Sequence, residues 1–298
     1  MSVRVGLALP ATGVDLGAFV DESERLGFDS LWVTERVNAA THDPVVAMTG
    51  AAARTSRMKI GASVMVLPGR QPALLAKALA SLDVLSGGRL LPAFGLGLPA
   101  REEHQAFGVE AGDRAAIFEE ALPLLRRLWA EDEVVHHGQW FTYDRARIDP
   151  KPVKRGFPVW MGGVTPRELD RVGRLADGWL AAFIGPARVE AAIAAIVEAT
   201  DRAGRSIDDD HYGSTIVYHP DPDLPAEAKA AVARLEPDTD PRELVATSPE
   251  ALEAILRRYV DVGASKFVVA PQGPHADWIG ELTTLAHVTR SVESWANA

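Results

Sequence analysis

The chain has 298 residues, of which 47% are hydrophobic and 24% are charged, a balance typical of a globular protein with an ample core. Its formal net charge of −10 argues against a nucleic-acid surface and against binding to anionic membranes, and the absence of cysteine excludes disulfides and thiolate chemistry. No apolar run approaches the roughly 18 residues of a membrane span, and the N-terminus lacks a signal-peptide pattern, so we expect a soluble, cytoplasmic protein.

The first part of the chain predicts two strand–helix pairs. Apolar residues alternate from Val3 to Leu9, as in a strand with one buried face. Asp15 can cap the following helix and Gly27 can end it. A second strand follows at Ser30–Thr34, and a second helix runs from Asp43–Pro44 to about Ala53.

The stretch from Lys59 to Leu98 predicts a strand, a helix and a second strand. The first strand runs from Met58 to Val66, and Pro72 suits the first position of the helix. Gly87–Gly88 ends that helix, and the apolar run Arg89–Phe94 then breaks into a glycine loop at Gly95–Leu98. In α/β folds ligands bind at the carboxyl ends of parallel strands, so chemistry is expected near Ser63–Val66 and Gly95–Leu98.

The remaining chain continues the alternation of strands and helices. Asp113–Trp129 is a clear amphipathic helix, and a hairpin is expected at Val134–Tyr143. The later elements are strands at Val159–Met161, Gly178–Ile184, Tyr212–Tyr218 and Lys266–Ala270, and helices at Thr165–Glu168 onward, Ala187–Ala203, Ser248–Val262 and Asp277–Ser294. Eight such pairs predict an α/β fold, a (β/α)8 TIM barrel, as a single domain over 1–298 with insertions near 134–158 and 220–247. A doubly wound open sheet is the alternative.

Two glycine-rich turns are candidate phosphate sites. Gly95–Ala100 matches G-x-G-x-x-A, but no acidic residue ends a second strand about 20 residues later, so a barrel loop is favoured over a dinucleotide turn. At Gly162–Thr165 two glycines precede a helix with a Thr165–Glu168 capping box, which would present amides and a helix dipole to an anion. A plain strand-to-helix turn explains that segment equally well.

Charged residues follow the second strand and the glycine loop. Glu35–Arg36 would lie at the strand end, where a salt bridge on the barrel rim is the simpler interpretation. Glu103 and its neighbours begin a helix, where acidic side chains often only complement the dipole. No metal spacing is seen among the eight histidines, and no hydrolase motif is present.

Several segments together resemble the luciferase-like monooxygenase superfamily, the bacterial-luciferase-type flavin and deazaflavin barrels. The resemblance is good over about residues 1–185, and Leu85-Ser-Gly-Gly-Arg89 is its most specific piece. Other matching segments are Gly27–Val33, Thr55–Gly61, Trp160–Gly163 and Ala176–Trp179.

The resemblance implies a TIM barrel, often a homodimer, with a flavin-type ring at the carboxyl-terminal mouth. The ring would rest on a bulge made by a non-prolyl cis peptide, which matches Ser63–Val64, so Ser63, Val64 and Met65 would back it. The phosphate-bearing tail would contact Gly97 and Leu98, or the turn formed by Gly162, Gly163, Val164 and Thr165.

The chain departs from the family at the end of the second strand. Many deazaflavin-using members carry Asp-His where this chain has Glu35–Arg36. Arg36 stays protonated, so it would stabilise negative charge or hold an anionic substrate rather than shuttle protons. Glu35 would flank the ring, and Glu103 would contact the substrate or the cofactor tail.

Three functional hypotheses follow from the resemblance. The first is an oxidoreductase dependent on coenzyme F-420 that transfers hydride to or from a small organic substrate. The second is an FMN-dependent monooxygenase supplied with reduced flavin by a separate reductase. The third is a barrel that binds a flavin without catalysis, which the arginine at position 36 motivates.

Overall fold

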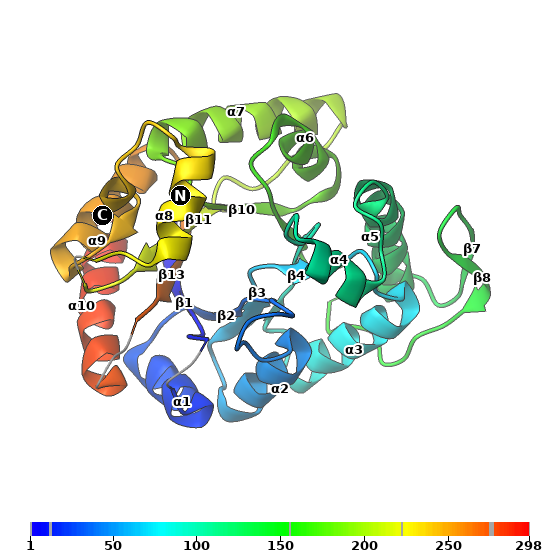
Figure 1. The fold of residues 1–298 in the computed structure, drawn as a ribbon. Coiled ribbons are helices and arrows are strands. Elements are labelled where there is room, and N and C mark those ends of the chain that lie inside the picture. Colours follow the sequence, from blue (N-terminus) through cyan, green and yellow to red (C-terminus); the bar gives the residue numbers. More distant parts are fainter. Residues whose placement is uncertain (1, 12–13, 155, 222, 274–276, 298) are drawn as a thin grey trace.

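The strands of the computed structural model form a closed ring, seen along its axis in Figure 1. The model describes residues 2–11, 14–154, 156–221, 223–273 and 277–297. Barrel strands three and four are each broken in two, as β3 (Lys59–Ala62) with β4 (Met65–Val66), and β5 (Leu90–Leu91) with β6 (Ala93–Gly95). The other barrel strands are β1 (Arg4–Ala8), β2 (Ser30–Val33), β9 (Trp160–Gly162), β10 (Gly178–Ala182), β11 (Tyr212–Tyr218) and β13 (Lys266–Pro271).

Parallel pairing closes the ring without a gap. β1 pairs with both β13 and β2, β3 pairs with β5, and β4 pairs with β6, which continues to β9. An open doubly wound sheet would have two unpaired edges, so that alternative is wrong and the predicted TIM barrel is confirmed.

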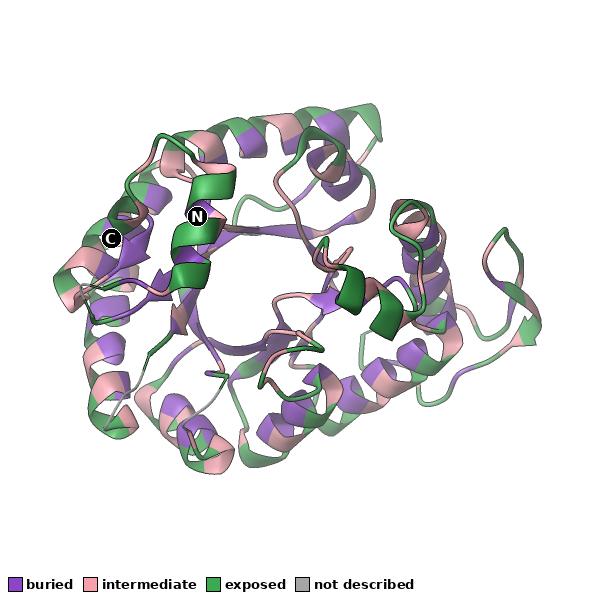
Figure 2. Cartoon of the chain, in the orientation of Figure 1, coloured by how far each residue is buried: buried purple, intermediate pink, exposed green. Residues whose placement is uncertain are grey.

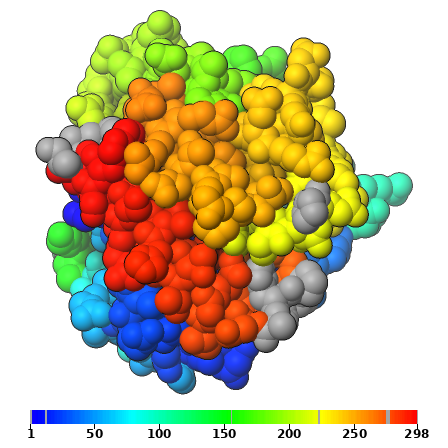
Figure 3. All heavy atoms as spheres, turned by 90° about the vertical axis from the view of Figure 1, so that its left-hand side faces the viewer, coloured from blue at the N-terminus to red at the C-terminus, as the bar shows by residue number. Residues whose placement is uncertain are grey.

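Helices surround the ring, and most of them bury one face against the strands (Figure 2). They are α1 (Leu16–Leu26), α2 (Pro44–Arg54), α3 (Pro72–Leu85), α4 (Arg101–Phe107), α5 (Arg114–Ala130), α6 (Pro166–Leu175), α7 (Pro186–Arg202), α8 (Ala226–Leu235), α9 (Pro249–Asp261) and α10 (Trp278–Ala296). Figure 3 shows α9 and α10 side by side on the outer surface. None of the helices in the described ranges combines the length and apolar character needed to cross a membrane.

Helix boundaries follow the capping residues expected from the sequence. The Asp15 carboxylate accepts a hydrogen bond from the Ala18 amide at 2.7 Å, and Ser248 Oγ accepts one from the Ala251 amide at 3.1 Å. Each satisfies an amide that the first helical turn leaves unpaired. Asp43 and Asp277 cap α2 and α10 in the same way.

The core has two layers. A large one lies between strands and helices, and a small one fills the barrel lumen with Ala8, Trp32, Ala93, Trp160, Leu180 and Val268. The Trp32 and Trp160 rings meet edge to face, with centroids 6.4 Å apart. The barrel is therefore a packed core rather than a pore.

The two insertions differ in how well the sequence foretold them. The predicted hairpin is present as β7 (Val134–His137) and β8 (Thr142–Ala146). The segment 220–247 was expected as an insertion with no predicted elements, and it contains α8 and the short strand β12 (Val245–Ala246), linked by the 3-10 turn Pro241–Glu243. Ala228 of α8 packs with Val217, Leu224 and Val245 in a separate small cluster, which ties the helix to the barrel.

Candidate active site

The carboxyl ends of the barrel strands gather the residues singled out from the sequence. In Figure 1, α4 and α8 lie in front of the ring, over this end. β2 leads directly to Glu35 and Arg36, and the β3–β4 break carries Ser63 and Val64. The glycine loop follows β6, the turn into α6 follows β9, and α4 carries Glu103.

The break between β3 and β4 forms the predicted bulge. The Ser63–Val64 peptide is cis, as expected from the family resemblance. The Val64 side chain lies against two glycines: a Cβ added to Gly95 would lie 2.6 Å from Val64 Cγ2, and one added to Gly162 would lie 3.3 Å from Cγ1. These glycines therefore give Val64 the room to project into the mouth, since a larger residue at 95 would collide with it.

Glu35 holds the strand that follows the bulge. Its Oε2 accepts the Val66 amide at 2.6 Å, and its other oxygen forms an ion pair with Arg70. Burial raises the pKa of Glu35 above its usual value, because desolvation outweighs the opposing effects of Arg70 and the Val66 amide. Glu35 thus takes part in a rim salt bridge that fixes β4, and its predicted place beside the cofactor ring stays a prediction.

The Arg36 side chain faces Glu103, whereas Glu35 pairs with Arg70. Its Nε lies 3.8 Å from Glu103 Oε1, and the side chains are 36% and 5% exposed. Both of these atoms are buried and have no hydrogen-bond partner in the described part of the chain. Buried polar atoms are nearly always hydrogen-bonded, so two facing exceptions at a strand end mark a place where a ligand atom can bind.

Arginine and histidine side chains fix the glycine loop. Arg114 Nη1 donates to the carbonyl oxygens of Leu96, Gly97 and Leu98 at 3.2–3.3 Å. The Leu98 carbonyl oxygen also lies 3.0 Å from His104 Nε2. No local sequence pattern points to Arg114, because it stands at the start of α5, outside the loop that it stabilises.

The turn after β9 already holds a carboxylate. Glu168 Oε2 accepts hydrogen bonds from the amides of Val164 and Thr165 and from Thr165 Oγ1, each at 2.9 Å. The Glu168 half of the expected capping box is therefore present. These are the same amides that were expected to hold a phosphate, so the turn can bind an anion, and its role toward a cofactor stays a prediction.

Comparison with known proteins identifies the family. A family model described as luciferase-like monooxygenase matches residues 5–283. The chain belongs to this family.

Curated relatives match only part of the chain. An uncharacterized protein of Mycobacterium tuberculosis is 34% identical over 141 residues, 47% of this chain and 50% of that protein. A phthiodiolone/phenolphthiodiolone dimycocerosates ketoreductase of the same species is 30% identical over 208 residues, 60% of this chain and 54% of the relative. The chain thus spans about half the length of the curated relatives it matches.

Solved structures share the whole fold. An F-420-dependent secondary alcohol dehydrogenase, solved with an F-420–acetone adduct, has a TM-score of 0.82 and 22% identity over 98% of this chain and 99% of its own. The oxygenating constituent of 3,6-diketocamphane monooxygenase from Pseudomonas putida, solved with FMN, has a TM-score of 0.79 and 15% identity over 99% of both chains. The fold is therefore that of luciferase-like oxidoreductases and monooxygenases, among which both cofactors occur.

Proposed function

We propose that this chain is an F-420-dependent oxidoreductase that transfers hydride between the deazaflavin and a small organic substrate in the barrel mouth. The observation that carries the proposal is the pair of buried atoms Arg36 Nε and Glu103 Oε1, which face each other at 3.8 Å and have no hydrogen bond in the described part of the chain. The ketoreductase name of one curated relative supports hydride chemistry over oxygenation.

A carbonyl substrate explains why both groups face the same space. Deazaflavin supplies a hydride when reduced, and the carbonyl carbon receives it. Negative charge then develops on the carbonyl oxygen, where the permanently charged Arg36 would stabilise it. A proton from water would complete the hydroxyl group, and Glu103, which faces Arg36, would orient the arginine toward the oxygen.

The residues at the mouth fit a ring with a phosphate-bearing tail. Gly95 and Gly162 leave a surface without side chains on either side of Val64, where a flat ring could rest on the bulge formed by Ser63, Val64 and Met65. Gly97 and Leu98 on one side, and the turn from Gly162 to Thr165 on the other, would hold the tail. A homodimer, and a separate reductase if FMN is used, remain part of this proposal.

Direct titration of the full chain with each cofactor tests the proposal. We expect F-420 to bind saturably, followed by its fluorescence, and FMN to bind more weakly; riboflavin, which lacks the phosphate, is the control for the tail contacts. A parallel assay would follow oxidation of reduced F-420 with small ketones and aldehydes.

The outcomes separate the three hypotheses. Tight binding of FMN without binding of F-420 would overturn the proposal in favour of the FMN-dependent monooxygenase. Binding of F-420 without hydride exchange to any carbonyl or from any alcohol would favour a barrel that only binds the cofactor.

The carboxylate in the turn after β9 gives a further prediction. Replacing Glu168 with alanine should lower the free energy of unfolding by about 1 kcal/mol, because the first turn of α6 loses its cap. Urea unfolding measures this loss. The same change should strengthen F-420 binding, because the freed amides become available to the phosphate.

An exposed first-turn glutamate elsewhere provides the control. Glu227 lies in the first turn of α8 and is exposed, so Glu227→Ala should change neither the free energy of unfolding nor the affinity for F-420 noticeably. Weaker F-420 binding by Glu168→Ala would contradict the assignment of the phosphate to this turn.

A further inference from the structure

A cavity lies at the opposite end of the barrel from the mouth. A cavity of about 350 Å³ is bounded by the first residues of four barrel strands, Arg4, Lys59, Trp160 and Lys266, together with Lys154 and His211. We propose that this cavity binds a tetrahedral oxyanion of the phosphate type, either free or as a small phosphomonoester. The inference does not depend on the proposed function at the mouth.

Cationic side chains outnumber carboxylates in the cavity lining by five to two, and by five to four when the adjoining Asp29 and Glu293 are included. Its cationic side chains are Arg4, Lys59, Arg89, Lys154 and Lys266, against the carboxylates of Asp83 and Asp210. Asp29 pairs with Lys266 and lies 3.9 Å from Lys59, and Glu293 is engaged by the Val5 amide. In a chain with a net charge of −10, this concentration of cations favours an anion.

Arg89 forms no ion pair in the described part of the chain; burial lowers its pKa, and the Glu24 carboxylate opposes that shift. Its guanidinium donates to the carbonyl oxygens of Ala52, Thr55, Met58 and Ser86 and to Thr55 Oγ1. These neutral acceptors fix the side chain and leave its full positive charge at the wall of the cavity. Arg89 therefore raises the potential of the cavity without competing for the ligand.

The decisive observation is an unpartnered indole. Trp160 is 3% exposed and lines the cavity, yet its Nε1 has no hydrogen-bond partner in the described ranges. The other buried indoles are satisfied: Trp32 donates to Ser30 Oγ, Trp129 to the Ala76 carbonyl and Trp179 to the Gly163 carbonyl, at 2.8–3.1 Å. An indole N–H can only donate, so the missing partner of Trp160 is an acceptor.

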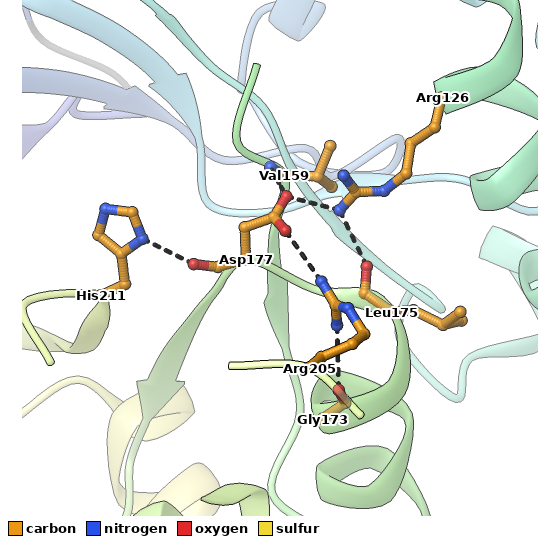
Figure 4. Close-up of polar contacts among 7 residues, drawn as sticks. All are labelled: Arg126, Val159, Gly173, Leu175, Asp177, Arg205 and His211. Carbon is orange, nitrogen blue, oxygen red and sulfur yellow. Dashed lines mark hydrogen bonds and ion pairs between the residues drawn. The ribbon is translucent and has the colours of Figure 1, made fainter. Parts of the chain in front are cut away.

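A hydrogen-bond network holds the wall beside Trp160 (Figure 4). The Asp177 carboxylate accepts from Arg126, Arg205 and the Val159 amide at 2.6–3.0 Å, and its carbonyl oxygen lies 2.7 Å from His211 Nδ1. The His211 ring lies 5.2 Å from the Trp160 ring, centroid to centroid. Because Nδ1 faces a carbonyl oxygen it carries a hydrogen, and Nε2 is left on the side away from Asp177.

Cations and donors converge on the cavity with few acceptors among them. Lys59 and Lys154 can balance the charge of a phosphate in the cavity, and a shift of the indole would bring Trp160 Nε1, which has no exposed surface in this structure, to one of its oxygens. A metal ion would instead meet these lysines and arginines. The group formed by Asp208, Asp210 and His211 at the edge of the cavity is empty and carries no separate site.

The test is a titration of the full chain with inorganic phosphate, at ionic strength held constant with chloride. Isothermal calorimetry and thermal unfolding should both report saturable binding. A double variant, Lys59→Met with Lys154→Met, should weaken binding at least about tenfold, as should Trp160→Phe, which removes the donor together with part of the ring and whose fold is checked by thermal unfolding without phosphate. Glycerol phosphate in place of inorganic phosphate distinguishes a phosphomonoester site, which binds it more tightly, from a site for the free ion.

Two controls separate this site from other anion sites. Lys77→Met removes an exposed lysine from α3, and Arg36→Met removes a cation at the mouth; phosphate should bind both variants as it binds the parent chain. Absence of saturable binding would overturn the proposal. Phosphate binding that is lost in Arg36→Met but retained in the lysine double variant would also overturn it, since the ion would then bind at the mouth.

Discussion

Arg36→Met should lower kcat with F-420 and a carbonyl substrate by about a hundredfold, while the dissociation constant of F-420 changes little. The expected loss is that of removing one preorganised charge from a developing oxyanion. Arg36 is suited to this role because its Nε is buried and faces Glu103 without a hydrogen bond. Steady-state kinetics and a fluorescence titration on the same preparation measure the two quantities.

The control for this prediction is Arg36→Lys, which keeps the charge and shortens the reach. We expect it to recover part of the lost kcat. Equal losses in kcat and in F-420 affinity for the methionine variant would contradict a role at the reacting atoms and would assign Arg36 to cofactor binding. Unchanged kcat would remove Arg36 from the chemistry altogether.

Asp29→Ala should destabilise the fold by about 3–5 kcal/mol, because it leaves the buried ammonium of Lys266 without a counter-charge. Lys266 is 4% exposed and forms an ion pair with Asp29. Burial lowers the pKa of Lys266 despite this pairing, whereas the nearby lysines hold the pKa of Asp29 below its usual value against the same desolvation. These two pKa shifts are those expected of a pair in which burying the Lys266 ammonium costs more free energy than burying the Asp29 carboxylate.

The double variant Asp29→Ala with Lys266→Met isolates the cause. It removes both charges, so it should recover most of the stability lost in the single variant. Chemical unfolding at neutral pH measures both. A double variant as unstable as Asp29→Ala would show that packing, and not the unpaired charge, accounts for the loss.

The pH dependence of this pair has a definite sign. The Asp29 pKa is lower in the folded chain than in the unfolded chain, so its contribution to stability is present above the unfolded pKa. That contribution is lost as the pH falls through the folded pKa. Asp29→Ala should therefore flatten the acid limb of the stability profile.

Periodicity and capping residues were sufficient to predict most of the barrel. Tyr212–Tyr218 was predicted with the bounds it has, because β-branched and aromatic residues there stand between clear turn signals. Helix starts at Asp15 and Ser248 were predicted because capping acts locally, through hydrogen bonds within three residues. The bulge at Ser63–Val64 was expected only from the family resemblance, since the apolar run Met58–Val66 shows no interruption.

Other contacts form only when the barrel closes, and no local sequence pattern indicates them. Lys266 and Asp29 stand 237 positions apart, and Arg114 stabilises a loop 16–18 positions before it. The sequence placed Glu35 and Arg36 at one rim but could not show that they face different partners, Arg70 and Glu103. Helix α8 was missed because its short alanine-rich pattern was outweighed by the prolines around it.

The side chains of Trp32 and Trp160 block the lumen of the barrel. Trp32 and Trp160 are almost fully buried among aliphatic side chains, so water and small molecules do not pass along the axis. In the proposed enzyme, cofactor and substrate therefore enter and leave through the same opening. A ring resting on Val64 would lie beneath the substrate, so in this proposal the cofactor would bind before the substrate and would be exchanged only after the product leaves.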